Sequence, residues 1–184
     1  MVKIPGITRT IIAALFIASA GLSTAAGEGN DYNHHLGVAA SSLSGIGLSY
    51  GYNFHPDYMF RVCGIYTESN DRISGTSQYT KDIWWNAGAE IQRFLFIIPS
   101  GNVAYTGYGL AGSNCWYSNY EDPLNPQDNN LNKRWTAGAA MGLRVVFFER
   151  IALNLEFGYQ YSRDIVEETV NTGLAAGAGA HFVF

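Results

Sequence analysis

Large apolar residues alternate with small or polar residues along most of the chain after residue 33. The clearest example is RIALNLEFGYQYSRD, residues 150–164, in which Leu155 and Phe157 belong to one parity and Glu156 to the other. A period of two predicts a β-strand whose two faces meet different surroundings. The pattern alone does not say which face points inward, and the rest of the chain has to decide it.

Eight segments of this kind are separated by turns rich in Gly, Pro, Asn, Asp and Ser. The last five predicted strands run 13 residues or more, whereas ordinary strands have about 5–6 residues. A strand that crosses a membrane needs about 9–11 residues. The predicted strands cover residues 34–41, 45–54, 58–67, about 81–97, 102–117, 133–148, 150–163 and 171–184.

The two faces of these strands differ in size as well as in polarity. One face carries Leu, Phe, Tyr and Trp, and the other carries mainly Gly, Ala, Ser and Asn. An eight-stranded barrel has an interior barely wide enough for its own side chains, so the small face must point inward. The large apolar face must then point outward, into lipid. The sequence therefore predicts an all-β fold, an eight-stranded antiparallel up-and-down transmembrane β-barrel with Glu156 inside.

The connections support this arrangement because short and long ones alternate. The longer, polar loops Glu68–Gln78, Ser118–Asn132 and Asp164–Val170 would lie at one end and carry any partner specificity. The short SLSG connection after the first strand departs from the pattern. Aromatic residues are expected to form a belt at each membrane interface. The two predicted belts are Trp84, Trp85, Trp116, Tyr117 and Trp135 near the long loops, and Phe54, Tyr58, Phe147, Phe148, Phe182 and Phe184 at the other rim.

Charged residues on the inward parity predict a salt-bridge network in the lumen. An unpaired buried carboxylate is costly, so Glu156 needs a partner. Arg144 lies on the inward parity of the neighbouring strand, and Arg61 and Glu90 are expected to share the same lumen. Two acids and two bases form a self-consistent plug. A structural role for this network is favoured over a catalytic or ion-conducting carboxylate.

The first residues resemble a secretory signal peptide. Met1–Arg9 contains two basic residues and no acid, Ile11–Ala20 is apolar, and small residues follow. Cleavage is expected after Ala26, which leaves a barrel domain of residues 27–184. Beyond the signal the longest apolar run is Phe94–Ile98, too short for a membrane-spanning helix. The formal net charge is −4, and the lack of a basic patch argues against a nucleic-acid partner.

Metal, cofactor and disulfide chemistry are not indicated. Cys63 and Cys115 could form a disulfide in an oxidising compartment, but their places on non-adjacent strands argue against one. Glu121, Asp122 and Asp128 lie together in one loop without the Asp spacing and Gly of an EF-hand. No metal site and no cofactor are therefore expected.

The C-terminal residues GAGAHFVF carry a family resemblance. A final strand that ends in Phe184, with Phe182 two residues earlier, is similar to the C-terminal signal of bacterial outer-membrane barrels. With the signal peptide and eight strands, residues 27–184 resemble the small OmpA-like and OmpX/OmpW-like barrels. The resemblance implies the outer membrane of a Gram-negative-type cell, and assembly through the barrel-assembly machinery that reads this signal. It also implies surroundings of membrane lipids and lipopolysaccharide, and a monomer.

Several functions remain open at this stage. A non-enzymatic barrel with a structural or surface-interaction role meets no contradiction. Lipid A deacylases of this architecture place His and Ser two residues apart on one strand, but none of His34, His35, His55 and His181 is followed by Ser at that spacing. A small passive channel would need a lumen free of side chains. A soluble lipocalin-type carrier would need the opposite assignment of the two faces.

Overall fold

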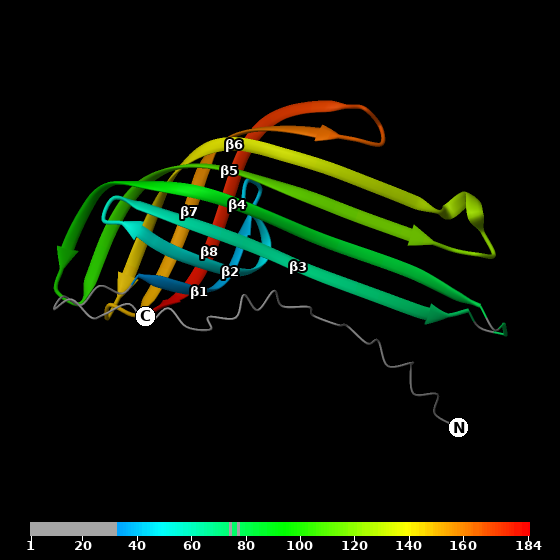
Figure 1. The fold of residues 1–184 in the computed structure, drawn as a ribbon, viewed down its shortest axis with the longest axis horizontal. Helices are drawn as coiled ribbons and strands as arrows, with labels where there is room; N and C mark the ends of the chain where they lie inside the picture. The colour runs from blue at the N-terminus through cyan, green and yellow to red at the C-terminus, as the bar shows by residue number, and fades with distance from the viewer. Residues whose placement is uncertain (1–32, 74, 77) are drawn as a thin grey trace, which may run out of the picture.

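The chain forms one closed antiparallel β-barrel in which each strand pairs with its neighbours in sequence and β1 pairs with β8. The computed structural model describes residues 33–73, 75–76 and 78–184. This topology confirms the predicted all-β, eight-stranded up-and-down barrel (Figure 1). The strands are β1 His34–Ser41, β2 Gly45–His55, β3 Tyr58–Arg72, β4 Tyr79–Ser100, β5 Val103–Glu121, β6 Asn130–Phe147, β7 Ile151–Asp164 and β8 Val170–Val183.

The two ends of the barrel differ in their connections. At the turn end, residues 56–57, 101–102 and 148–150 join strands tightly, and the chain's C-terminus lies there. At the loop end, longer segments join β3 to β4, β5 to β6 and β7 to β8, and one of them contains the short 3₁₀ helix η1, Pro126–Asp128. The predicted signal peptide, residues 1–26, lies outside the described residues. Within the described residues no helix could span a membrane.

The strands are strongly tilted, as the pairing register shows. The ladder from Ala180 on β8 passes through Val38 on β1 and Leu48 on β2, crosses the remaining strands, and returns to β8 at Val170, ten residues away. A stagger of this size around eight strands corresponds to a tilt of about 40° from the barrel axis. The barrel is therefore narrow, with room inside for side chains only.

The barrel wall is uneven in height. β1 and β2 end close to their predicted limits, but β3 continues to Arg72 and β4 begins at Tyr79. The polar segment after residue 67, predicted as loop, pairs with β4 down to Arg72↔Tyr79. Because polar side chains do not prevent backbone pairing in water, the hairpins extend beyond the alternating pattern. Figure 1 shows the β3–β4 and β5–β6 hairpins reaching far past the β1–β2 hairpin.

The short β1–β2 turn, residues 42–44, folds into the barrel rather than standing at its rim. Leu43 is 1% exposed and packs with the other members of a buried cluster. The Asn114 side chain donates a hydrogen bond to the backbone carbonyl of Ser42 at 2.7 Å. This inward fold explains why the SLSG connection is shorter than the other loop-end connections. The other cluster members are Tyr108, Leu110, Ala140 and Ala175.

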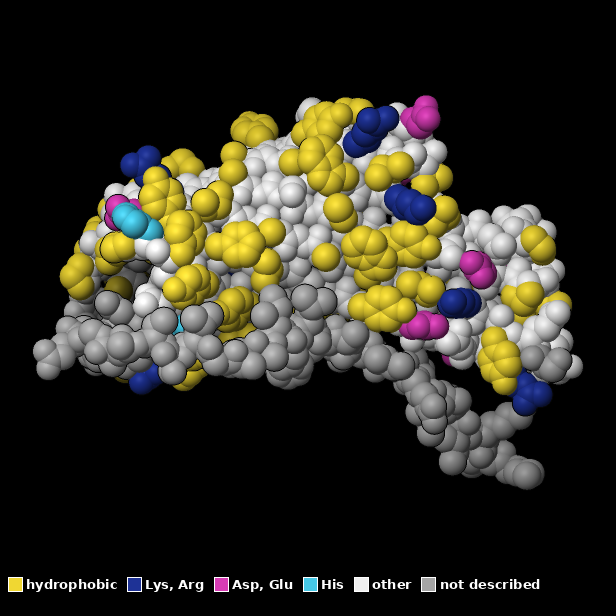
Figure 2. Space-filling model, in the orientation of Figure 1, with side chains coloured by type: hydrophobic (Ala, Val, Ile, Leu, Met, Phe, Trp, Pro, Cys, Tyr) yellow, Lys and Arg dark blue, Asp and Glu magenta, His cyan; other side chains and the backbone are white. Residues whose placement is uncertain are grey.

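The outward face of the barrel is the large apolar face, as predicted. Leu155 and Phe157 are 66% and 63% exposed, while Glu156 between them is 6% exposed. Figure 2 shows hydrophobic side chains over the middle of the visible face, with acidic and basic side chains toward the two ends. The orientation inferred from side-chain size is therefore correct.

The predicted aromatic belt near the long loops needs a correction. Trp84 and Trp116 have the same parity as the inward-facing Asn86 and Asn114. Their rings meet edge to face at a centroid distance of 6.1 Å. They therefore line the inner side of the tall wall, and only the other three residues of that set have the outward parity. The parity of Trp84, which it shares with the lumen residue Glu90 on the same strand, could have placed this ring on the inner face.

Candidate functional site in the barrel lumen

A buried ion-pair cluster occupies the middle of the lumen. Arg61 on β3 donates from Nη2 to Glu90 on β4 at 2.9 Å and to Glu156 on β7 at 2.5 Å. The Tyr108 hydroxyl donates to the same Glu156 oxygen at 3.1 Å, and Arg61 also reaches the Ser44 hydroxyl at 3.3 Å. All of these side chains are buried. Arg61 thus links opposite walls of the barrel to the β1–β2 turn.

Arg144, expected to pair with Glu156, makes other contacts. Its Nη2 donates to Gln92 Oε1 at 2.6 Å, and its guanidinium lies 5.5 Å from the centre of the Tyr108 ring. Arg144 is the register partner of Asn154, two residues from Glu156 toward the turn end. Gln92 in turn donates to Glu90 at 2.5 Å, so the Gln92 amide connects Arg144 to the ion pairs of Arg61.

The residues of this lumen network are therefore only partly those of the prediction. The structure brings together Arg61, Glu90 and Glu156 directly, and Arg144 through Gln92. Gln92 and Tyr108 were missed. The parity of Gln92, two residues after Glu90, could have identified it. Tyr108 could not be identified that way, because most tyrosines of the chain face outward.

A Ser–His pair lies nearer the turn end of the lumen. The His181 Nε2 and the Ser49 Oγ are 2.9 Å apart, and both residues are buried. Spacing along a single strand cannot reveal this pair, because Ser49 is on β2 and His181 on β8, on either side of β1. Ser49 is the central residue of GLSYG, residues 47–51, which has the G-x-S-x-G spacing but lies within β2 and not at a strand-to-helix turn. Neither residue lines the cleft described next.

A polar cleft of about 340 Å³ lies above the β1–β2 turn, inside the tall wall. Ser41 and Ser42, at the β1–β2 turn, line one side of the cleft. Strands β4 to β7 line the other side, mostly with amides, hydroxyls and one guanidinium. The full lining is Ala40, Ser41, Ser42, Ile46, Asn86, Asn114, Trp116, Arg134, Thr136, Gln160, Ser162 and Ala176.

The cleft has a positive character. Arg134 is the one charged residue among the described residues that line it, and its guanidinium lies 5.6 Å from the centre of the Trp116 ring. The residue paired with Arg134 across the β6–β7 ladder is an acid, Asp164. Asp164 directs Oδ1 to the backbone N–H groups of Val166 and Glu167, at 2.9 and 3.0 Å. These hydrogen bonds hold the charged carboxylate in the β7–β8 loop, and it forms no ion pair with Arg134 in the described structure.

The acidic β5–β6 loop organises itself rather than a metal. Asp122 accepts hydrogen bonds from the side chain and backbone of Asn125 and from the backbone N–H of Leu124. The Asn125 side chain, with these N–H groups, holds the pKa of Asp122 below its usual value. Among the described residues, no group of three or more His, Cys, Asp and Glu side chains is placed to bind a metal ion.

The two cysteines are free thiols on opposite faces of the wall. Cys63 on β3 is buried on the lumen side, and Cys115 on β5 is exposed. Facing opposite sides of the sheet, they cannot bridge without moving backbone.

The C-terminal aromatics lie on the outer face at the turn end. The Phe184 ring stacks on the ring of His34 at 5.6 Å and on that of Phe182 at 6.2 Å. Phe184 and His34 also exchange two backbone hydrogen bonds of 2.9 Å. The last residue thus helps to close the barrel at the seam between β8 and β1.

Comparison with known proteins gives similarity in structure only. No protein-family model and no curated sequence matches the chain. The N-terminal β-barrel domain of Pseudomonas aeruginosa OprF is 15% identical, with a TM-score of 0.45 over 83% of this chain and 96% of that one. Ail, the attachment invasion locus protein of Yersinia pestis, solved with the heparin analogue sucrose octasulfate, is 17% identical, with a TM-score of 0.40 over 83% and 97%. Likeness at this level does not transfer a function.

Proposed function

We propose that the chain is an integral outer-membrane β-barrel, not an enzyme, with a structural or surface-interaction role and a lumen filled by side chains. The observation that carries the proposal is the apolar belt on the barrel exterior. On β7 the outward side chains from Ile151 to Tyr161 are all apolar or aromatic, and Arg150 and Arg163 flank them. A soluble barrel would bury this face and leave the polar one in water.

The height of the belt fits a bilayer. The 11 residues from Ile151 to Tyr161 extend roughly 35 Å along the strand, which projects to about 25 Å at a tilt near 45°. Apolar belts of outer-membrane barrels have about this height. Charged side chains on the visible face lie toward the ends, where a bilayer would present water and head groups (Figure 2).

The contents of the lumen favour a closed barrel over a passive channel. The ion pairs of Arg61 span the interior, and Leu43 of the β1–β2 turn lies in an apolar cluster across the same space. Both features would have to move before a solute could pass. The Ser49–His181 pair is buried, so its hydroxyl is not accessible to a lipid A substrate in this structure.

The proposal includes a route to the membrane. Residues 1–26 would direct export and be removed, and Phe182 and Phe184 would be recognised by the barrel-assembly machinery. The mature barrel would reside as a monomer among membrane lipids and lipopolysaccharide. The loop end of the barrel, which carries most of the exposed Asp, Glu and Asn residues, would then face the outside and offer the surface for any partner.

Site-directed labelling tests the membrane assignment. In a background with Cys63→Ala and Cys115→Ala, single cysteines at Leu155, Glu156 and Phe157 are reacted in cells with a probe confined to the bilayer. The exposed positions 155 and 157 should react and position 156 should not. Labelling at 156 alone would reverse the orientation of the wall. Absence of labelling at all three positions in folded protein would refute the membrane location.

A further inference from the structure

The wall of the barrel has a notch on the side of the β1–β2 hairpin. The β2–β3 ladder extends toward the loop end only to Leu48↔Gly64, and the β1–β8 ladder only to Ser41↔Gly177. Beyond these pairs β3 continues to Arg72 beside β4, and β8 begins at Val170 beside β7. Within the described strands, β3 and β8 therefore rise on either side of the low hairpin without a ladder partner between them.

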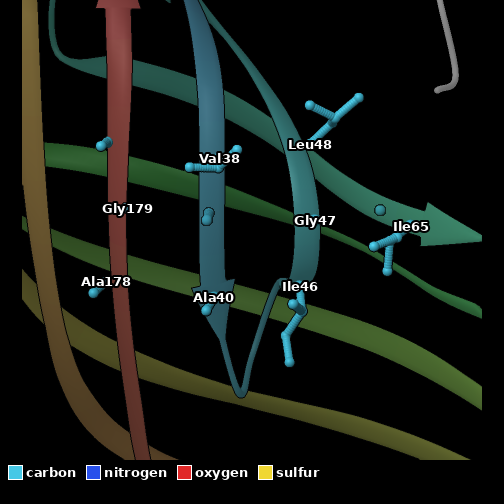
Figure 3. A pocket seen from close by; sticks show the side chains of 11 residues that line it. Val38, Ala40, Ile46, Gly47, Leu48, Ile65, Ala178 and Gly179 are labelled. Carbon is cyan, nitrogen blue, oxygen red and sulfur yellow. The ribbon is translucent and has the colours of Figure 1, made fainter. Parts of the chain in front are cut away.

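Two hollows meet at the notch. The polar cleft lies inside the wall, and an apolar groove of about 620 Å³ lies outside it, lined by residues of β8, β1, β2 and β3. Ala40 and Ile46 line both hollows. Figure 3 shows Val38, Ile46 and Leu48 on the hairpin, Ala178 on β8 and Ile65 on β3 around the groove.

The small residues of this region make the groove. Gly47 and Gly64 have no side chain, and Ala178 and Ala180 replace the large residues found on most of the outer face. Gly47 has a φ of 134°, a conformation that favours glycine, and a Cβ at this position would collide with the backbone oxygen of Gly64 on β3. The groove is thus built into the backbone.

The junction of the hollows lies near one edge of the apolar belt. Ile46 is connected by the ladder through Ala40 and Ala178 to Leu155 on β7. Because the strands are tilted, each step along this ladder from β7 to β2 moves about 3 Å toward the loop end, or about 10 Å over three steps. Leu155 lies in the middle part of the belt, so Ile46 is close to its loop-end edge. That is the depth of lipid head groups.

The outer groove is apolar and the inner cleft is polar, which matches the acyl chains and the head group of a lipid. The groove offers apolar and small side chains, while the cleft offers the Arg134 guanidinium and the Gln160 amide. The amides of Asn86 and Asn114, which also line the cleft, hydrogen-bond to backbone groups of the barrel. Gln160 Oε1 has no hydrogen-bond partner within the described structure. No described acid lines the cleft. These groups fit an anionic head group with hydroxyl or ester oxygens.

We propose that the notch binds an anionic lipid of the surrounding bilayer, with its head group in the cleft near Arg134 and an acyl chain in the outer groove. The inference rests on the proposed membrane location. It adds a specific lipid site to a barrel whose remaining exterior would meet lipid without selection.

The head-group part is tested by native mass spectrometry of detergent-folded protein titrated with phosphatidylglycerol and phosphatidylcholine. The variant is Arg134→Gln and its control is Lys133→Gln. Lys133, the adjacent residue on the outward parity, has a similar ring contact, 5.7 Å from the centre of Tyr117. Arg134→Gln should weaken phosphatidylglycerol binding about tenfold and leave phosphatidylcholine unchanged. Lys133→Gln should change either lipid less than twofold.

The chain part is tested by filling the groove. Ala178→Phe places a ring in the groove, and Ala139→Phe places the same ring on the exposed outer face of β6. Ala178→Phe should weaken phosphatidylglycerol binding severalfold, and Ala139→Phe should not. Glycerol phosphate, the head group without chains, should fail to compete at concentrations where the lipid saturates.

Three results would overturn the proposal: equal losses in Arg134→Gln and Lys133→Gln, no loss in Ala178→Phe, or full competition by glycerol phosphate. Each variant is first checked for heat-modifiable migration on a gel, which reports the folded barrel independently of the lipid. A barrel that folds and labels as a membrane protein but shows no selectivity for phosphatidylglycerol refutes the site and leaves the proposed function intact.

Discussion

At the scale of single residues, the lumen is organised around one cation. Arg61 is 1% exposed and has two carboxylates within hydrogen-bond distance. Removing one partner of a buried ion pair leaves an uncompensated charge, which costs more than the pair itself contributes. The stability of the network therefore depends on its completeness, since Glu90 and Glu156 cannot reach water when Arg61 is lost.

Replacing Arg61 with Met should lower the free energy of unfolding by about 3–5 kcal/mol. The measurement is urea denaturation of the protein folded in detergent. The double variant Arg61→Met, Glu156→Gln removes one charge of each sign, keeps Glu90 linked to Arg144 through Gln92, and should recover most of the loss. Arg93→Met, on the outer face beside Tyr58, is the matched control and should have a much smaller effect. A double variant no more stable than the single one would contradict the charge argument.

Sequence parity predicted which charges share the lumen, but not which atoms meet. Arg61, Glu90, Arg144 and Glu156 all lie inward, because inward parity follows from the period of the strands. The partner of Arg144 depends on register and on side-chain length across the axis, and neither can be obtained from one strand's pattern. Gln92 took the place that the prediction gave to Glu156.

At the scale of elements, the β1–β2 hairpin determines the shape of the molecule. Its short strands lower the wall on one side, and its turn fills the lumen that a longer loop would leave open. The eight strands were predictable because alternation persists along each of them. The extension of β3 and β4 was not, because the added residues are polar on both faces and carry no period-two signal.

Replacing Leu43 with Ala should destabilise the barrel by about 2–4 kcal/mol, because a fully buried Leu leaves a cavity. Leu36 on the same hairpin is 52% exposed on the outer face, and Leu36→Ala is the matched control with an expected loss below about 1 kcal/mol. Urea midpoints in one detergent compare the two. Equal midpoints would show that the turn does not dock inside the barrel in solution.

At the scale of the whole molecule, closure depends on the pairing of the last strand with the first. Strand tilt and stagger leave no free edge except at the notch, because β8 returns to β1 along Ser41↔Gly177 to His35↔Val183. A barrel closed in this way needs its C-terminal strand before it has a complete wall. The end of the chain is therefore available for recognition until closure and becomes part of the seam afterwards.

Deleting Phe184 should impair assembly in cells more than it impairs the folded barrel. The ring stacks on His34 and remains 45% exposed, so its loss costs roughly 1–3 kcal/mol of apolar burial. A barrel with strands of this length should tolerate that loss. If the ring is also the feature that the assembly machinery reads, cells should accumulate unassembled chain although the same variant refolds in detergent.

The matched control is Phe182→Ala with Phe184 retained, which removes the stacked neighbour but keeps the terminal ring. Surface protein is measured by protease accessibility of the loops in intact cells, and folding by heat-modifiable migration after refolding from urea. Normal surface levels of the Phe184 deletion would refute recognition. Failure in cells and in detergent alike would assign Phe184 to the stability of the β1–β8 seam, where its two backbone hydrogen bonds with His34 lie.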